Sequence, residues 1–202
     1  MLKTIFWLLL AYVIGSIPWG LIIGKVFFHK DIRQYGSGNL GGTNAGRVLG
    51  TPIGILVILL DSMKAFLMML LCNKLNPGIE QYIGLMVCVG HCFPIFANFK
   101  GGKAVACSYG YLLGLALFVT NEFVFTFLIP LIVFLITLII SKMVSLSSMV
   151  GLSSAVFTLL KVSYKLSILQ LILALFVIYR HSANIKRIIN KTESKISFKK
   201  KK

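Results

Sequence analysis

Glycine, amide and hydroxyl residues crowd into one short segment near the start of the chain. Five of the eleven residues from Gly36 to Gly46 are glycine, and the polar residues among them are Ser37, Asn39, Thr43 and Asn44. Glycine lets successive backbone N–H groups turn toward one anion, and Arg47, which follows, can hold a phosphate through two hydrogen bonds. The segment therefore indicates phosphate binding, with a flexible linker as the simpler alternative. The glycines that we place in this binding segment are Gly36, Gly38, Gly41 and Gly42.

Two later segments carry further hydrogen-bond donors. The segment from Gly90 to Lys103 holds His91 and ends in Gly101-Gly102-Lys103, and a second segment contains His181, Asn184 and Arg187. In a helix the last three residues would share one face, because they are spaced by three. Simpler alternatives exist for some of these residues: a lysine can anchor a membrane span, and His91 can be a hydrogen-bonded core histidine.

The composition excludes a soluble domain. The chain has 202 residues, of which 57% are hydrophobic and 13% are charged, and its mean hydropathy is +0.90. Ordinary soluble domains carry about 25% charged residues. The net charge of +16 alone would suggest nucleic acid, but too few polar residues remain to build a nucleic-acid-binding surface. Long apolar runs also exclude disorder, so we expect an integral membrane protein that binds no nucleic acid.

Seven apolar ranges are candidates for membrane-spanning helices, which need roughly 20 mostly apolar residues each. Helices are expected because lipid offers no hydrogen-bond partners to backbone N–H and C=O groups, which a helix pairs internally. The predicted fold is therefore all-α with seven transmembrane helices. The ranges are Ile5–Phe28, Pro52–Cys72, Ile79–Ala97, Ala104–Thr120, Phe123–Ser141, Val144–Leu160 and Tyr164–Tyr179. Residues 1–195 would form one membrane domain, and residues 196–202 a basic tail suited to anionic lipid.

The basic residues predict the orientation of these helices. With seven spans, sixteen Lys and Arg residues fall on one side of the membrane and four on the other. Basic residues favour the cytoplasmic side, so the N-terminus is expected outside and the C-terminus in the cytoplasm. All three donor-rich segments then face the cytoplasm, which predicts a site there for phosphorylated ligands. Within the second span, Asp61 and Lys64 are spaced to form an ion pair.

Four motifs in order resemble one known family, the bacterial acyl-phosphate:glycerol-3-phosphate acyltransferases of the PlsY type. The motifs are Gly15-Ser-Ile-Pro-Trp-Gly-Leu-Ile-Ile-Gly-Lys25, the Gly36–Arg47 segment, the Gly90–Lys103 segment, and His181-x-x-Asn184-x-x-Arg187 with Glu193 beyond. The resemblance implies seven membrane helices and a site at the cytoplasmic face of the bacterial cell membrane. The implied reaction moves a fatty acyl group from acyl phosphate to the 1-hydroxyl of glycerol 3-phosphate. It gives lysophosphatidic acid and inorganic phosphate, as the first step of phospholipid synthesis.

The resemblance also assigns roles to residues. It implies a catalytic set that holds glycerol 3-phosphate, with His181 beside it: Ser37, Arg47, Lys103, His181, Asn184 and Arg187. The remaining binding residues would be Gly36, Gly38, Asn39, Gly41, Gly42, Thr43, Asn44, His91, Gly101, Gly102 and Glu193. No metal or cofactor is implied, because acyl phosphate is already activated. The oligomeric state stays open.

Some residues depart from the family pattern, and some alternatives remain. Ala104 and Cys107 replace a usual Gly and Thr, Gly42 replaces Ala, and Lys191 replaces a Gly just before Glu193. The hydroxyl proton of glycerol 3-phosphate could pass to the leaving phosphate or to a histidine base. A transporter of phosphate compounds would use similar loops, although no inverted repeat is evident. An accessory subunit without chemistry would leave the glycine-rich segment unexplained.

Overall fold

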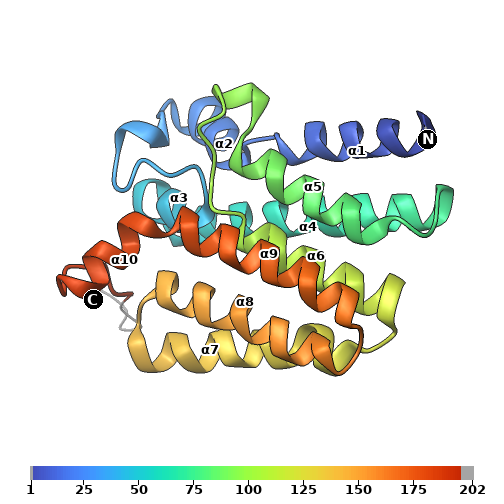
Figure 1. Cartoon of the computed structure of the whole chain (residues 1–202). Helices are drawn as coiled ribbons and strands as arrows, with labels where there is room; N and C mark the ends of the chain where they lie inside the picture. Colours follow the sequence, from blue (N-terminus) through green and yellow to red (C-terminus); the bar gives the residue numbers. More distant parts are fainter. Residues whose placement is uncertain (1, 197–202) are drawn as a thin grey trace. The chain divides into compact units, whose positions relative to one another are not determined.

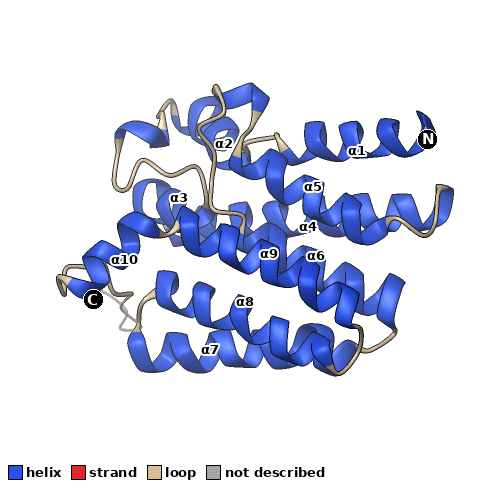
Figure 2. Ribbon diagram, in the orientation of Figure 1, coloured by secondary structure: helices blue, strands red, loops and turns tan. Residues whose placement is uncertain are grey.

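The computed structural model describes residues 2–196, and every regular element in that range is helical (Figures 1 and 2). Of the predicted basic tail, only Ile196 falls inside the described residues. The chain divides into two compact units, residues 1–121 and residues 122–202. Each unit is described by itself below.

The first unit is built around the long helix α4. Helices α3, α5 and α6 all pack against α4, and α1 lies alongside α5 (Figure 1). Pro52 falls in the first turn of α4, where a missing backbone N–H costs nothing. The elements of this unit are α1 (Leu2–Gly15), α2 (Trp19–Phe28), η1 (Ile32–Gln34), α3 (Gly42–Leu49), α4 (Thr51–Leu75), α5 (Glu80–Cys92), η2 (Ile95–Ala97), α6 (Val105–Leu115) and a π-helical turn η3 (Ala116–Thr120).

The first predicted span is broken in the structure. Helices α1 and α2 meet at an angle of 41°, with Pro18 at the junction. Proline disfavours helical backbone in the residue before it, which explains the break. Just before the break, α1 approaches α5 very closely: a Cβ at Gly15 would lie 2.4 Å from the carbonyl oxygen of Val87, and one at Gly90 would lie 2.3 Å from that of Tyr12. Two glycines therefore allow this helix contact.

The second unit is a set of antiparallel helices in which α8 packs against both α7 and α9. Ser163 begins α9 by accepting a hydrogen bond from the backbone N–H of Leu166. At the other end, α9 and α10 meet at 62° around His181. The elements are a π-helical turn η4 (Val124–Leu128), α7 (Ile129–Ser141), α8 (Val144–Leu160), α9 (Tyr164–Arg180) and α10 (Ser182–Ile189).

Each of the seven predicted ranges is occupied by helix. Among the described residues, three helices are long and apolar enough to cross a membrane: Thr51–Leu75, Glu80–Ala97 and Val124–Ser141. The bent pairs α1–α2 and α9–α10 raise this number to five if each pair is one span. Val105–Thr120 and Val144–Leu160 are shorter apolar helices. The all-helical membrane fold is thus supported, while the number of seven spans and their orientation remain predictions.

Candidate phosphate-binding site

The glycine-rich segment is organised from within by Asn44. The side chain of Asn44 is buried, and its Oδ1 accepts a hydrogen bond from the backbone N–H of Ser37 at 2.8 Å. Its Nδ2 donates to the carbonyl oxygens of Ile32 and Tyr35 at 2.9 and 3.2 Å. Gly36 has a φ of +62°, a conformation suited to glycine, and a Cβ there would lie 2.4 Å from Asn44 Oδ1. Asn44 therefore shapes the segment.

The second half of the segment is the start of a helix. Helix α3 begins at Gly42, and its N-cap residue Gly41 is fixed by a hydrogen bond from its own N–H to Asn39 Oδ1 at 2.9 Å. The first N–H groups of a helix lie outside the helical hydrogen-bond ladder, and here they belong to Gly42 and Thr43. Such a terminus favours anions. Arg47 follows Thr43 by one turn and is exposed, so both can serve the same ligand.

The other arginine beside this segment is already paired. The guanidinium group of Arg33 binds both carboxylate oxygens of Asp31, and Lys25 Nζ lies 3.6 Å from the same carboxylate. The hydrogen bonds from Arg33 lower the pKa of Asp31 to about 2, although partial burial of the carboxylate opposes this shift. Asp31 is therefore ionised and offsets the charge of Arg33. Arg47 is left as the cation of the segment that is best placed to bind an external anion.

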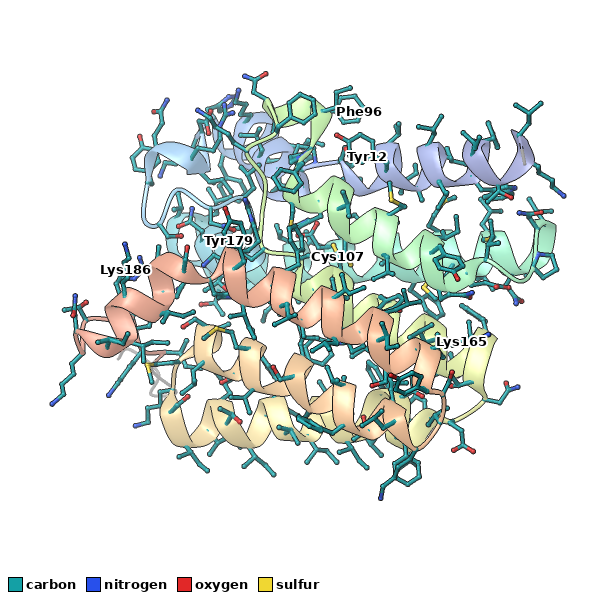
Figure 3. All side chains as sticks on the ribbon, viewed as in Figure 1. Tyr12, Phe96, Cys107, Lys165, Tyr179 and Lys186 are labelled. Atoms are coloured by element: carbon teal, nitrogen blue, oxygen red, sulfur yellow. The ribbon has the colours of Figure 1, made fainter. Side chains whose placement is uncertain are left out.

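The segment from Gly90 to Lys103 forms a closed loop after α5. The backbone N–H groups of Gly101 and Gly102 donate to the carbonyl oxygens of Cys92 and His91, at 3.2 and 3.0 Å. These two bonds bring the returning chain back along the end of α5. On the other side of the loop, Tyr12 Oη of α1 donates to the carbonyl oxygen of Phe93 at 2.8 Å (Figure 3). The loop therefore places Lys103, which is half-buried, at a fixed point near the end of α5.

One apolar cluster packs both loops of the first unit together. It includes Ile32 from η1, Leu40 and Ala45 from the glycine-rich segment and Ala97 from the loop after α5. Helices α2 and α4 contribute Leu21, Ile23 and Val57 to the same cluster. The two predicted phosphate-binding loops of this unit therefore share one rigid support, although they are about fifty residues apart in sequence.

In the second unit, Glu193 draws three polar side chains together. Its Oε1 accepts hydrogen bonds from Ser145 Oγ at 2.7 Å and Asn184 Nδ2 at 2.6 Å, and its Oε2 accepts one from Arg187 Nε at 2.7 Å. Burial of the carboxyl group tends to raise the pKa of Glu193, but these hydrogen bonds outweigh it and hold the pKa below its usual value. Glu193 thus orients Asn184 and Arg187.

Two neighbouring residues complete this arrangement. His181 is buried at the junction of α9 and α10, and its Nδ1 lies 2.8 Å from the carbonyl oxygen of Val177. A carbonyl oxygen can only accept, so Nδ1 carries hydrogen, and a neutral ring then has its lone pair on Nε2. Lys191 adopts a φ of +58°, the left-handed conformation for which the family usually has glycine. Lysine therefore keeps the turn that brings Glu193 back to α10.

The predicted site residues fall into one group in each unit. The first unit holds Ser37, Arg47, Lys103, Gly36, Gly38, Asn39, Gly41, Gly42, Thr43, Asn44, His91, Gly101 and Gly102, and the second holds His181, Asn184, Arg187 and Glu193. Within each unit the structure gathers the predicted segments as just described. That both groups serve one ligand stays a prediction. Sequence reasoning missed Ser145, because a serine 48 residues before Glu193 gives no local signal.

Comparison with known proteins identifies the family. A family model described as glycerol-3-phosphate acyltransferase matches residues 5–191. A glycerol-3-phosphate acyltransferase of Listeria monocytogenes serovar 1/2a is 47% identical over 195 residues, covering 94% of this chain and 95% of the relative. One of Geobacillus kaustophilus is 47% identical over 197 residues, covering 95% of each chain.

The fold agrees with two solved structures. A crystal structure of PlsY (YgiH), an integral membrane glycerol 3-phosphate acyltransferase in its glycerol 3-phosphate form, has a TM-score of 0.87 at 32% identity and 96% coverage of both chains. Its lysophosphatidic acid form has a TM-score of 0.84 at 31% identity. The similarity therefore covers nearly the whole length of the chain in both sequence and fold. The chain belongs to the glycerol-3-phosphate acyltransferase family of the PlsY type.

Proposed function

We propose that this protein transfers a fatty acyl group from acyl phosphate to the 1-hydroxyl of glycerol 3-phosphate at the cytoplasmic face of a bacterial membrane. The observation that carries this proposal is the match, at 96% coverage, to an enzyme structure in its glycerol 3-phosphate form. The first unit adds independent support, because the N-terminus of α3 presents backbone N–H groups suited to phosphate and each of its two loops carries a cation, Arg47 or Lys103.

The reaction needs positioning more than it needs a nucleophile. Acyl phosphate is a mixed anhydride, so the hydroxyl oxygen of glycerol 3-phosphate attacks the acyl carbon directly. A carbon–oxygen bond forms to that hydroxyl oxygen, and the bond between the acyl carbon and the phosphate oxygen breaks. Holding two reactants in attack geometry can supply roughly 7–11 kcal/mol of the barrier. The products are lysophosphatidic acid and inorganic phosphate.

The residues of the first unit would divide between the two substrates. The segment from Gly36 to Asn44 would bind the phosphate and carbonyl of acyl phosphate through backbone N–H groups, chiefly those of Gly42 and Thr43 at the start of α3, which lie outside the helical hydrogen-bond ladder. Ser37, Arg47 and Lys103 would bind glycerol 3-phosphate. Oriented donors of this kind contribute about 2.7–4 kcal/mol each when charge develops in the transition state.

The residues of the second unit would also bind glycerol 3-phosphate. Asn184 and Arg187 are both hydrogen-bonded to Glu193, which fixes their side chains before substrate arrives. A fixed donor loses less conformational entropy on binding than a free one. His181 would lie beside the bound substrate. The hydroxyl proton would pass to the leaving phosphate, which becomes a base as the bond to the acyl carbon breaks.

A comparison of acyl donors tests this proposal. The purified protein in lipid vesicles is given labelled glycerol 3-phosphate with palmitoyl phosphate, palmitoyl coenzyme A or free palmitate. We expect labelled lysophosphatidate from palmitoyl phosphate alone. Product from palmitoyl coenzyme A at an equal rate would contradict the proposed donor. Transport of labelled glycerol 3-phosphate into the vesicles without any acylation would favour the transporter alternative.

A further inference from the structure

Three ionisable side chains are buried together where α4 meets the end of α5, and two of them, Asp61 and Lys64, have no role in the proposed mechanism. Asp61 is 1% exposed, Lys64 6% and His91 7%. Lys64 Nζ lies 2.9 Å from Asp61 Oδ1 and 3.0 Å from His91 Nδ1, and it donates to the carbonyl oxygen of Ile17 at 3.1 Å. The ammonium group of Lys64 therefore donates to a carbonyl oxygen, contacts an imidazole nitrogen and forms an ion pair with a carboxylate. Buried charges are retained only with such pairing.

A metal ion is the first ligand to consider for this cluster. Asp61, His91 and Cys107 bring one ligand atom each to within 4.8 Å of one another, and Cys107 lies on α6 (Figure 3). The ammonium of Lys64, however, already contacts Asp61 Oδ1 and His91 Nδ1, so it lies against two of the three side chains that would bind the metal. A positive charge there would repel a metal cation. Lys64 is therefore the cation of this cluster.

The cluster determines which edge of the His91 ring carries hydrogen. Lys64 offers only donors, so a neutral His91 must accept at Nδ1, and its hydrogen then lies on Nε2. The alternative is a charged His91 whose Nδ1–H faces Asp61 Oδ1 at 3.4 Å, and that form also carries hydrogen on Nε2. In both forms Nε2 is a donor. A general base needs a lone pair, which this ring does not offer at Nε2.

The Nε2 edge faces the Gly101–Lys103 segment. A Cβ on Gly102 would lie 2.0 Å from His91 Nε2, so the ring edge packs directly on the α-carbon of Gly102. The carbonyl oxygen of His91 also accepts a hydrogen bond from the N–H of Gly102 at 3.0 Å. His91 therefore contacts this glycine through both its ring and its backbone. A shift of the ring would shift the backbone that leads into Lys103.

We propose that Asp61 and Lys64 are positioning residues: they hold His91 with a hydrogen-bearing Nε2 against Gly102, and the affinity for glycerol 3-phosphate depends on that arrangement. The dependence on glycerol 3-phosphate rests on the proposed function. The geometry of the His91 ring does not depend on the proposed function, so a separate experiment can test it.

Nitrogen NMR of ¹⁵N-histidine-labelled protein in lipid tests the ring directly. The chain has three histidines, so His91→Gln, His29→Gln and His181→Gln variants assign each signal. We expect Nε2 of His91 to carry hydrogen and to lose its wild-type shift in Lys64→Met, while His181 keeps its signals. An Nε2 of His91 without hydrogen, or signals unchanged in Lys64→Met, would overturn the proposal. This result is independent of whether the protein is an acyltransferase.

Steady-state kinetics test the link to substrate. Lys64→Met should raise KM for glycerol 3-phosphate about tenfold to a hundredfold, with a smaller change in kcat. An effect of this size is expected when a substrate-binding group is displaced by about 1 Å. Because Lys64→Met leaves Asp61 unpaired and can fail to fold, the neutral double variant Asp61→Asn with Lys64→Met is measured beside it. The double variant restores charge balance without restoring the position of His91, so we expect its KM to stay raised. A wild-type KM in the double variant would overturn the proposal, since charge balance alone would then explain the cluster.

Glu80→Gln is the matched control. Glu80 is a buried acid at the opposite end of α5, where it accepts hydrogen bonds from Asn73 and Gly78. Replacing this carboxylate with an amide should lower the stability of the protein and leave KM for glycerol 3-phosphate unchanged. An equal rise of KM in Glu80→Gln would overturn the proposal by showing a general effect of destabilising α5. An inactive wild-type protein would instead contradict the proposed function, and the NMR result would still decide the ring geometry.

Discussion

The two histidines of the candidate site are held in opposite ways. His91 presents a hydrogen at Nε2, whereas His181 donates the hydrogen on Nδ1 to the carbonyl oxygen of Val177, so that a neutral His181 has its lone pair on Nε2. Of the two rings, only that of His181 can have the Nε2 lone pair that a general base requires. If the leaving phosphate takes the proton, even His181 is dispensable for proton transfer.

Single His→Gln variants test this point. We expect kcat of His181→Gln and of His91→Gln to fall by roughly threefold to tenfold, because neither ring removes the proton. Loss of a general base would cost about 10²–10⁴-fold. A loss of that size in His181→Gln, measured as kcat at saturating glycerol 3-phosphate, would assign the proton to His181 and contradict transfer to the phosphate.

Arg47 and Lys103 are expected to matter through their charge and geometry. Arg47→Ala and Lys103→Ala should each lower kcat/KM for glycerol 3-phosphate by roughly a hundredfold or more, because each removes an oriented donor. Arg47→Lys should recover little, since an ammonium cannot form the paired hydrogen bonds of a guanidinium. Lys161→Ala is the control: Lys161 lies over the ring of Phe125, 5.5 Å from its centroid. Equal activity in all these variants would refute the assignment of the site residues.

At the scale of elements, the turn after α10 depends on a carboxylate. The pKa of Glu193 is lowered in the folded protein, so its contribution to stability is full above the usual glutamate pKa of about 4.3 and is lost as the pH falls through the lowered value. We expect Glu193→Gln to lower the melting temperature at neutral pH and to make the melting temperature fall less steeply as the pH drops below about 4. An unchanged melting curve for Glu193→Gln would contradict the role of Glu193 in this turn.

The sequence predicts these elements unevenly, and the reasons are physical. Long apolar runs have few alternatives to helix, so the seven ranges are occupied by helix as predicted. The Asp61–Lys64 pair was also predicted correctly, because three residues apart on a helix they must be neighbours. Helix α3 was not predicted, since glycines disfavour helix, and its stability depends on packing against α4, where Gly42 and Gly46 approach Gly54 closely. The contact between His91 and Lys64 could not be predicted, because helical periodicity relates only nearby residues and these two are 27 positions apart.

For the whole molecule, the distribution of basic residues predicts an orientation that labelling can test. Single-cysteine substitutions at Lys74, Lys100 and Lys161 place a thiol at the end of α4, in the loop after α5 and at the end of α8, and all three positions are exposed. The four native cysteines are buried, so their background reaction should be low. We expect a membrane-impermeant maleimide to label Lys74→Cys and Lys161→Cys in intact cells, and Lys100→Cys only after the membrane is opened. Labelling of Lys100→Cys in intact cells would contradict a cytoplasmic site.

The reaction itself is the most direct test of the whole interpretation. Purified protein in lipid vesicles is supplied with palmitoyl phosphate and labelled glycerol 3-phosphate, and both products are measured over time. We expect lysophosphatidate and inorganic phosphate to appear in equal amounts, with no product when either substrate is left out. Absence of lysophosphatidate under conditions in which a known acyltransferase of this family is active would contradict the proposed function.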